Sequence, residues 1–103
     1  MKIENNYIYL TDAEISALVD AIEIDEDGHL HLEHEVGDVV ICVTADFVPY
    51  YDYDLGMEQR CFDSWYGPFS LTVSAYTEDA LLNVPYKDVY LAINKAISNR
   101  EWR

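Results

Sequence analysis

The longest apolar run of the chain extends from Asp38 to Val48 and is rich in β-branched residues. Pro49 follows it, so the run predicts a strand. Because strand side chains point alternately to two faces, one row is entirely apolar and the other becomes polar towards its far end. We therefore expect the central strand of a sheet with one buried face. The apolar row comprises Val39, Ile41, Val43, Ala45 and Phe47, and the second row comprises Val40, Cys42, Thr44, Asp46 and Val48.

A second segment alternates cleanly just before this strand, from His29 to Val36. Gly37-Asp38 separates the two segments, and a two-residue connection of this type joins antiparallel strands in a tight hairpin. The row that we expect to face the core contains Leu30, Leu32, His34 and Val36, and the opposite row contains His29, His31, Glu33 and Glu35.

Two other segments have apolar residues at helical spacing. The first covers residues 12–22 and opens with Thr11 and Glu14, the pattern of a capping box in which each side chain bonds to the backbone of the other residue. The second opens at Pro85, because proline is tolerated in the first turn of a helix. Its predicted buried stripe comprises Tyr86, Val89, Tyr90, Ile93, Ala96 and Ile97.

Further strands complete the expected sheet. Residues 6–10 are short and aromatic, which is typical of an edge strand. The central strand is expected to continue through Tyr51–Tyr53, turn near Leu55-Gly56 and return through Gln59–Asp63, because a long structureless loop is unusual in a small domain. Phe69–Tyr76 is the next strand. Its predicted core face carries Phe69, Leu71, Val73 and Ala75.

This order of elements predicts one α+β domain over residues 1–103: a two-layer sandwich, with two helices on one face of an antiparallel sheet of four to five strands. No apolar run approaches the roughly 20 residues of a membrane span. The first residues also lack the apolar core of a signal peptide. We therefore expect a cytoplasmic protein that does not enter a membrane.

The net charge of −14 is unevenly distributed along the chain. Residues 1–59 contain fifteen acidic residues and one basic residue, whereas residues 60–103 contain five of each. An acidic excess repels nucleic acid and attracts basic partners, but it also simply keeps a small protein dispersed. Both interpretations stay open, and we expect the acids of residues 12–58 to lie on one side of the molecule.

Few residues have the sequence context that catalysis requires. Cys42 and Cys61 are too few for a disulfide scaffold or a four-ligand zinc site, and we expect Cys42 to be buried in the central strand. The serines lack the setting of a catalytic nucleophile, and the four scattered glycines form no phosphate-binding loop. The sequence thus predicts neither an enzyme nor a bound cofactor.

The segment from Glu23 to His34 resembles the calcium loop of an EF-hand, with acids at its first, third and fifth positions and Gly28 at its sixth. The resemblance implies calcium ligands from Glu23, Asp25 and Asp27. The segment departs from that family at its twelfth position, where His34 replaces a bidentate carboxylate. The alternative is an acidic turn in which Asp27-Gly28 reverses the chain.

His29 and His31 are further candidate metal ligands because they share one face of a strand, about 6.6 Å apart. With Glu33 they supply two or three ligands for zinc or another divalent ion. Nothing in the sequence marks the remaining ligands, and a solvent-facing row of histidine and glutamate is the simpler interpretation.

The segment that follows the central strand is rich in aromatic and acidic residues. Tyrosine and tryptophan concentrate in interface hot spots, and flanking acids select a basic partner. The competing interpretation is that these rings complete the core, as we expect for Trp65 and one of the adjacent tyrosines. The candidate partner-binding residues are Tyr50, Tyr51, Asp52, Tyr53, Asp54, Trp65 and Tyr66.

We therefore predict a non-catalytic interaction protein that binds a basic protein partner through this segment. One form is an inhibitor that imitates nucleic acid, with carboxylates such as Glu33 and Glu35 in place of phosphates. Two alternatives stay open: a divalent-metal or calcium-binding module built on Glu23–Glu35, and a homo-oligomeric structural protein whose exposed sheet face pairs with itself.

Overall fold

The computed structural model describes residues 1–53, 60–100 and 102, with the side chains of residues 52, 53, 60 and 61 outside that description. Its elements in chain order are β1 (Lys2–Glu4), β2 (Tyr7–Tyr9), α1 (Asp12–Asp20), β3 (His29–Val36), β4 (Val39–Tyr53), β5 (Arg60–Tyr76), β6 (Leu81–Leu82), a π-helical turn η1 (Tyr86–Tyr90) and α2 (Leu91–Asn99).

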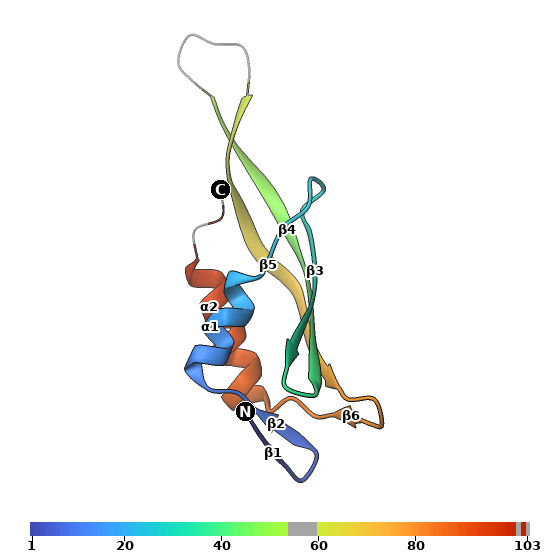
Figure 1. Cartoon of the computed structure of the whole chain (residues 1–103). Coiled ribbons are helices and arrows are strands. Elements are labelled where there is room, and N and C mark those ends of the chain that lie inside the picture. The colour runs from blue at the N-terminus through green and yellow to red at the C-terminus, as the bar shows by residue number, and fades with distance from the viewer. Residues whose placement is uncertain (54–59, 101, 103) are drawn as a thin grey trace.

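The main sheet is antiparallel, with the strand order β3-β4-β5-β6. Helices α1 and α2 lie side by side against one face of it (Figure 1), which we call the inner face. The opposite, outer face carries no helix in Figure 1. The predicted α+β class is therefore confirmed, and so is the hairpin in which Val36 pairs with Val39 across Gly37-Asp38.

The strand predicted over residues 6–10 does not belong to the main sheet. β2 pairs with β1 in a separate two-stranded sheet, because Asn5 and Asn6 adopt φ values of 53° and 67° and close a tight turn between them. β2 also bonds to the segment before η1: the Ile8 N–H donates to the Asn83 carbonyl at 3.0 Å. This hairpin therefore covers one end of the core rather than extending the main sheet.

The core forms where the apolar row of β4 meets the helices. All five residues of that row are at most 5% exposed, as the alternation predicts. They belong to one cluster with the buried faces of both helices. The helical residues in that cluster with the lowest exposure are Leu18 from α1 and Ile93 and Ile97 from α2.

Helix α1 begins as predicted. The Thr11 N–H donates to Glu14 Oε1 at 3.0 Å, and the Glu14 N–H donates to Thr11 Oγ1 at 3.2 Å, so both halves of the capping box are formed. These bonds pair two backbone donors that would otherwise have no partner within the helix.

The second helix differs from the prediction in its first turn. It opens as η1, where the N–H groups of Val89 and Tyr90 both donate to the Pro85 carbonyl. A π turn holds one more residue than an α turn, which rotates Tyr86 out of the predicted buried stripe. Tyr86 is 63% exposed and stacks on Tyr90 with ring centroids 5.3 Å apart.

Beyond the helices, β4 and β5 continue as a two-stranded ribbon, which we call the arm (residues 46–53 and 60–69). Pairing with β3 ends at Asp46, and Figure 1 shows the arm projecting past both helices. The molecule measures 59 × 22 × 19 Å as a result. The predicted continuation of the central strand to Tyr53 is confirmed, whereas the predicted turn at Leu55-Gly56 lies outside the described residues.

The pairing of β4 with β5 shifts register at three places in or next to the arm. At each shift β5 contains one residue more than β4, which is the signature of a β-bulge. At the first bulge Ser70 adopts a φ of 55°, and Phe69 pairs with Asp46 on the outer face. The prediction that Phe69 faces the core is therefore wrong, because the extra residue between Phe69 and Leu71 places these two side chains on opposite faces.

Candidate interaction surface

The outer face of the arm carries a patch of exposed side chains, four apolar or aromatic and one acidic, which we call the outer patch: Asp46, Val48, Tyr50, Tyr66 and Phe69. Asp46 pairs with Phe69 across the ribbon, and Val48 pairs with Tyr66. The rings of Tyr50 and Tyr66 meet edge to face with centroids 5.3 Å apart, which places them on the same side.

The apolar members of the outer patch are strongly exposed. Val48 is 52% exposed, Tyr66 55% and Phe69 51%. Monomeric soluble proteins rarely leave large apolar groups clustered in water, and such clusters mark sites of interaction. The exposure follows from the position of the patch, because both helices lie against the inner face and Figure 1 shows no helix over the outer face.

The inner face of the arm carries a different set of rings. Phe47 is buried and meets Trp102 at 5.6 Å between ring centroids. Trp65 is half-buried and packs against the core. Phe62 contacts Trp65 at 5.1 Å and Tyr51 at 6.3 Å, so a row of rings extends the core outward along the ribbon.

The predicted partner-binding segment therefore does not form one surface. The structure brings Tyr50 and Tyr66 together on the outer face, and it places Tyr51 and Trp65 on the inner face. The packing of Trp65 against the core agrees with its predicted role. The side chains of Asp52 and Tyr53 and the whole of Asp54 lie outside the described residues.

Val48 and Phe69 were not predicted as contact residues, although both are exposed in the outer patch. Strict alternation placed Phe69 in the core. The useful signal was Pro68, because a proline inside a strand marks an edge or a bulge. Pro68 immediately precedes Phe69, and Ser70 occupies the bulge.

A histidine–carboxylate pair borders the outer patch. His29 Nδ1 lies 2.8 Å from Asp46 Oδ1, and the two side chains are 64% and 54% exposed. The hydrogen bond with Asp46 raises the pKa of His29, and the negative charges of Asp25 and Asp27 act in the same direction. Asp46 thus accepts a bond from a planar nitrogen group at the root of the arm.

The acidic segment that resembles a calcium loop forms a turn in which the Asp25 side chain accepts bonds from the backbone. Asp25 Oδ1 accepts bonds from the N–H groups of Asp27 and His29, both at 2.9 Å. The Gly28 N–H donates to the Asp25 carbonyl, and Gly28 has a φ of 86°. A Cβ at Gly28 would lie 2.2 Å from the Phe47 carbonyl oxygen, so glycine also allows the turn to approach β4.

The candidate metal ligands are not gathered around a common point in the described part of the chain. His29 pairs with Asp46, while His31 Nε2 lies 3.8 Å from Glu33 Oε1. Glu23 is exposed at the start of the acidic turn. Among the residues that the structure describes, no group of three or more histidine, cysteine, aspartate or glutamate side chains is placed to hold a metal ion.

Acidic residues lie on both layers of the molecule, which contradicts the expected concentration on one side. Asp12 and Asp20 are exposed on α1, which covers the inner face. Glu33 and Glu35 are exposed on β3, on the same side as His29 and Asp46. The charge is therefore a property of the whole surface, and only Asp46 belongs to the outer patch itself.

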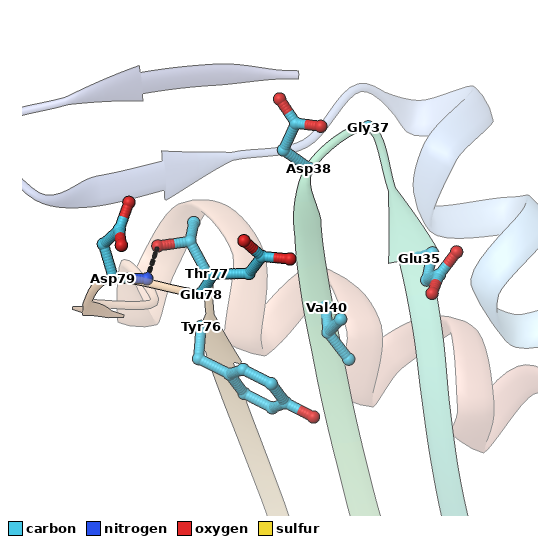
Figure 2. A pocket seen from close by; sticks show the side chains of 8 residues that line it. All are labelled: Glu35, Gly37, Asp38, Val40, Tyr76, Thr77, Glu78 and Asp79. Atoms are coloured by element: carbon cyan, nitrogen blue, oxygen red, sulfur yellow. Dashed lines mark hydrogen bonds between the residues drawn. The ribbon is translucent and has the colours of Figure 1, made fainter.

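A shallow hollow of about 570 Å³ lies at the other end of the outer face. Figure 2 shows that its residues come from the turn between β3 and β4, from the turn between β5 and β6, and from the ends of β3, β4 and β5. Burial and the nearby charge of Glu33 raise the pKa of Tyr76 in its wall. Its lining residues are Glu35, Gly37, Asp38, Val40, Tyr76, Thr77, Glu78 and Asp79.

Cys42 is the one cysteine whose side chain the structure describes, and it is a free thiol. It is half-buried on the outer face rather than buried, because no helix covers the second row of β4. The side chain of Cys61 lies outside the described residues.

Comparison of the chain with protein-family models, with curated proteins and with solved structures found no match. Within the part of the chain that the structure describes, no helix is long and apolar enough to cross a membrane. Conclusions about function therefore depend on the surface of the molecule itself.

Proposed function

We propose that this chain is a non-catalytic interaction protein that binds a basic protein partner through the outer patch of the arm. The observation that carries the proposal is the exposure of Val48, Tyr66 and Phe69 on a ribbon that projects from the folded body. Interface hot spots are rich in aromatic residues, and a projecting hairpin can present them without rearrangement of the core.

The charge of the molecule supports a basic partner. A net charge of −14 on 103 residues creates a field that attracts positive proteins over a Debye length, about 10 Å at 0.1 M salt. Because the acids surround both layers, the field promotes encounter, whereas the outer patch provides the contacts that hold the partner in one place.

Self-association through the open edge of β5 is less well supported. β6 pairs only with Ala75 and Tyr76, so the rest of β5 has no strand on that side within the described residues. However, the three bulges and Pro68 interrupt this edge, and proteins use such features to prevent edge-to-edge pairing. The faces of the arm are therefore better contact surfaces than its edge.

A pull-down from extracts of the cells that make the protein tests the proposal. The wild type and the control Tyr86→Ala should retain the same partner, because Tyr86 is at least as exposed as Tyr66 and Phe69 but lies in η1. The double variant Tyr66→Ala/Phe69→Ala should lose it while staying folded, with a thermal unfolding midpoint only slightly below that of the wild type. Retention should also fall as salt rises from 0.1 to 0.5 M.

Equal retention by all three proteins would show that the outer patch is not the contact surface. A retained species with the mass of the chain itself, measured by mass spectrometry, would favour the homo-oligomer instead.

A further inference from the structure

We propose that the outer patch receives an arginine of the partner, with the guanidinium group paired to the Asp46 carboxylate and lying against the ring of Phe69. The inference rests on the proposed function and specifies the chemistry of the group that the partner supplies.

The first support is the position of the carboxylate. Asp46 and Phe69 are direct cross-strand neighbours, and their side chains therefore leave the ribbon about 5 Å apart on one face. Both are more than half exposed. A cation that pairs with Asp46 on this face is therefore within reach of an aromatic ring that is open to water.

The second support is the group that Asp46 already binds. His29 presents a planar nitrogen donor to Asp46 Oδ1 at 2.8 Å. This contact shows that the carboxylate is oriented to accept from a flat donor on the outer face. A guanidinium group has the same planarity and offers five N–H donors, so it can bond to both carboxylate oxygens.

The third support is the aromatic surface that continues from Phe69. Tyr66 is exposed one pair further along the arm, and its edge-to-face contact with Tyr50 holds its ring in place. Guanidinium groups lie readily over such rings because they are planar and weakly hydrated. The chain already contains one such contact, with the Arg100 guanidinium carbon 4.5 Å from the centroid of the Trp102 ring.

These features favour arginine over lysine. An ammonium group is compact and strongly hydrated, and it pairs with a carboxylate as a point charge without stacking. At an exposed site the aromatic contact contributes about 0.5–1 kcal/mol, which corresponds to roughly a two- to fivefold difference in affinity. A basic partner that used only charge would show no such preference.

His29 gives the contact a dependence on pH. When His29 is protonated it neutralises Asp46 and competes with the guanidinium group. The other charged groups that act on His29 are Asp25 and Asp27 in the preceding turn, and their negative charges also favour its protonated form. Binding of arginine should therefore strengthen as the pH rises and His29 loses its proton.

The test uses three synthetic peptides in which four arginine, four lysine or four citrulline residues alternate with serine. Their affinity for the full chain is measured by fluorescence anisotropy at pH 8 and 0.1 M salt. We expect the arginine peptide to bind roughly three times more tightly than the lysine peptide, and the citrulline peptide to bind least. Asp46→Asn and Phe69→Ala should each bring the ratio of arginine to lysine affinity close to one.

Matched controls are Asp88→Asn and Tyr86→Ala, which remove an exposed carboxylate and an exposed ring from η1. Both should leave the ratio of affinities unchanged. A fourth variant, His29→Ala, should bind the arginine peptide equally well at pH 5.5 and pH 8, whereas the wild type should bind it less well at pH 5.5.

Equal affinity for the arginine and lysine peptides, or a ratio that survives Asp46→Asn, would overturn the inference. Either result leaves the proposed function standing, because a basic partner could still be lost from the Tyr66→Ala/Phe69→Ala variant in the pull-down. Failure of that pull-down, in contrast, would overturn the proposed function whatever the peptides do.

Discussion

At the scale of single residues, the contact between His29 and Asp46 has the clearest consequence for solution behaviour. It joins the first residue of β3 to the root of the arm, at the pair of the β3–β4 ladder that lies nearest to the arm. The hydrogen bond with Asp46 raises the pKa of His29 above its value in the unfolded chain, which is about 6.5. Protonation of His29 therefore favours the folded state.

This raised pKa predicts the direction of a change in stability with pH. The contribution of His29 is fully present below the unfolded pKa and is lost as the pH rises through the folded pKa. The free energy of unfolding in urea, measured between pH 5.5 and pH 8.5, should fall more in the wild type than in Asp46→Asn. Parallel pH profiles for the two proteins would show that the contact does not persist in solution.

At the scale of elements, β4 and β5 present two unlike faces along the arm. On the inner face Trp65 packs against the core, and ring contacts continue from it to Phe62 and Tyr51, which are 44% and 43% exposed. In the outer patch, Val48, Tyr66 and Phe69 are each more than half exposed. Trp65 contributes to stability because it packs against the core, and its backbone N–H lies 3.4 Å from the Trp102 carbonyl oxygen. Replacement of Trp65 and replacement of its neighbour Tyr66 should therefore lower the free energy of unfolding by different amounts.

Replacing Trp65 and Tyr66 separately with alanine should distinguish the two faces. Trp65→Ala should lower the free energy of unfolding by roughly 2–3 kcal/mol, less than the ~3–5 kcal/mol of a fully buried aromatic because Trp65 is half-buried. Tyr66→Ala should cost about 0.5 kcal/mol, as is typical of surface positions. Chemical denaturation of both variants provides the measurement, and equal losses would contradict the assignment of faces.

Local patterns predicted the elements whose causes are local. The capping box at Thr11, the hairpin at Gly37-Asp38 and the apolar row of β4 each depend on residues close in sequence, and all three are found. The bulge at Ser70 and the π turn at Tyr86 were not predicted. Each depends on one extra residue relative to its surroundings, and alternation alone does not reveal that residue.

The candidate site was predicted only in part for the same reason. The described members of the aromatic segment line the arm, and whether they bind a partner stays a prediction. Its division between two faces depends on register across β4 and β5, and a shift of one residue exchanges the faces. The sequence therefore indicated which residues are unusual but not which of them share a surface.

At the scale of the whole molecule, the arm makes the protein longer than its size requires. The radius of gyration of the Cα atoms is 16.2 Å, whereas a compact chain of this length has a value of about 13 Å. The excess comes from a ribbon that extends away from the helices (Figure 1).

Small-angle X-ray scattering should detect this shape directly. We expect a radius of gyration near or above 16 Å and an asymmetric distance distribution with a long tail at 0.1 M salt. The molar mass from light scattering on the same sample should equal that of one chain, 11.9 kDa, since copies with a charge of −14 repel one another. A radius near 13 Å would show that the arm folds back onto the body.

Because the arm projects clear of the helices, its length is free to vary during evolution without disturbance of the core. Removal or addition of one residue pair, one from each strand, would change its reach by about 3.3 Å and would also invert the two faces beyond that point. Two pairs would change the reach by about 6.6 Å and restore the faces. Related chains with arms of different length should therefore differ by even numbers of residue pairs, with the bulges kept at the root of the arm.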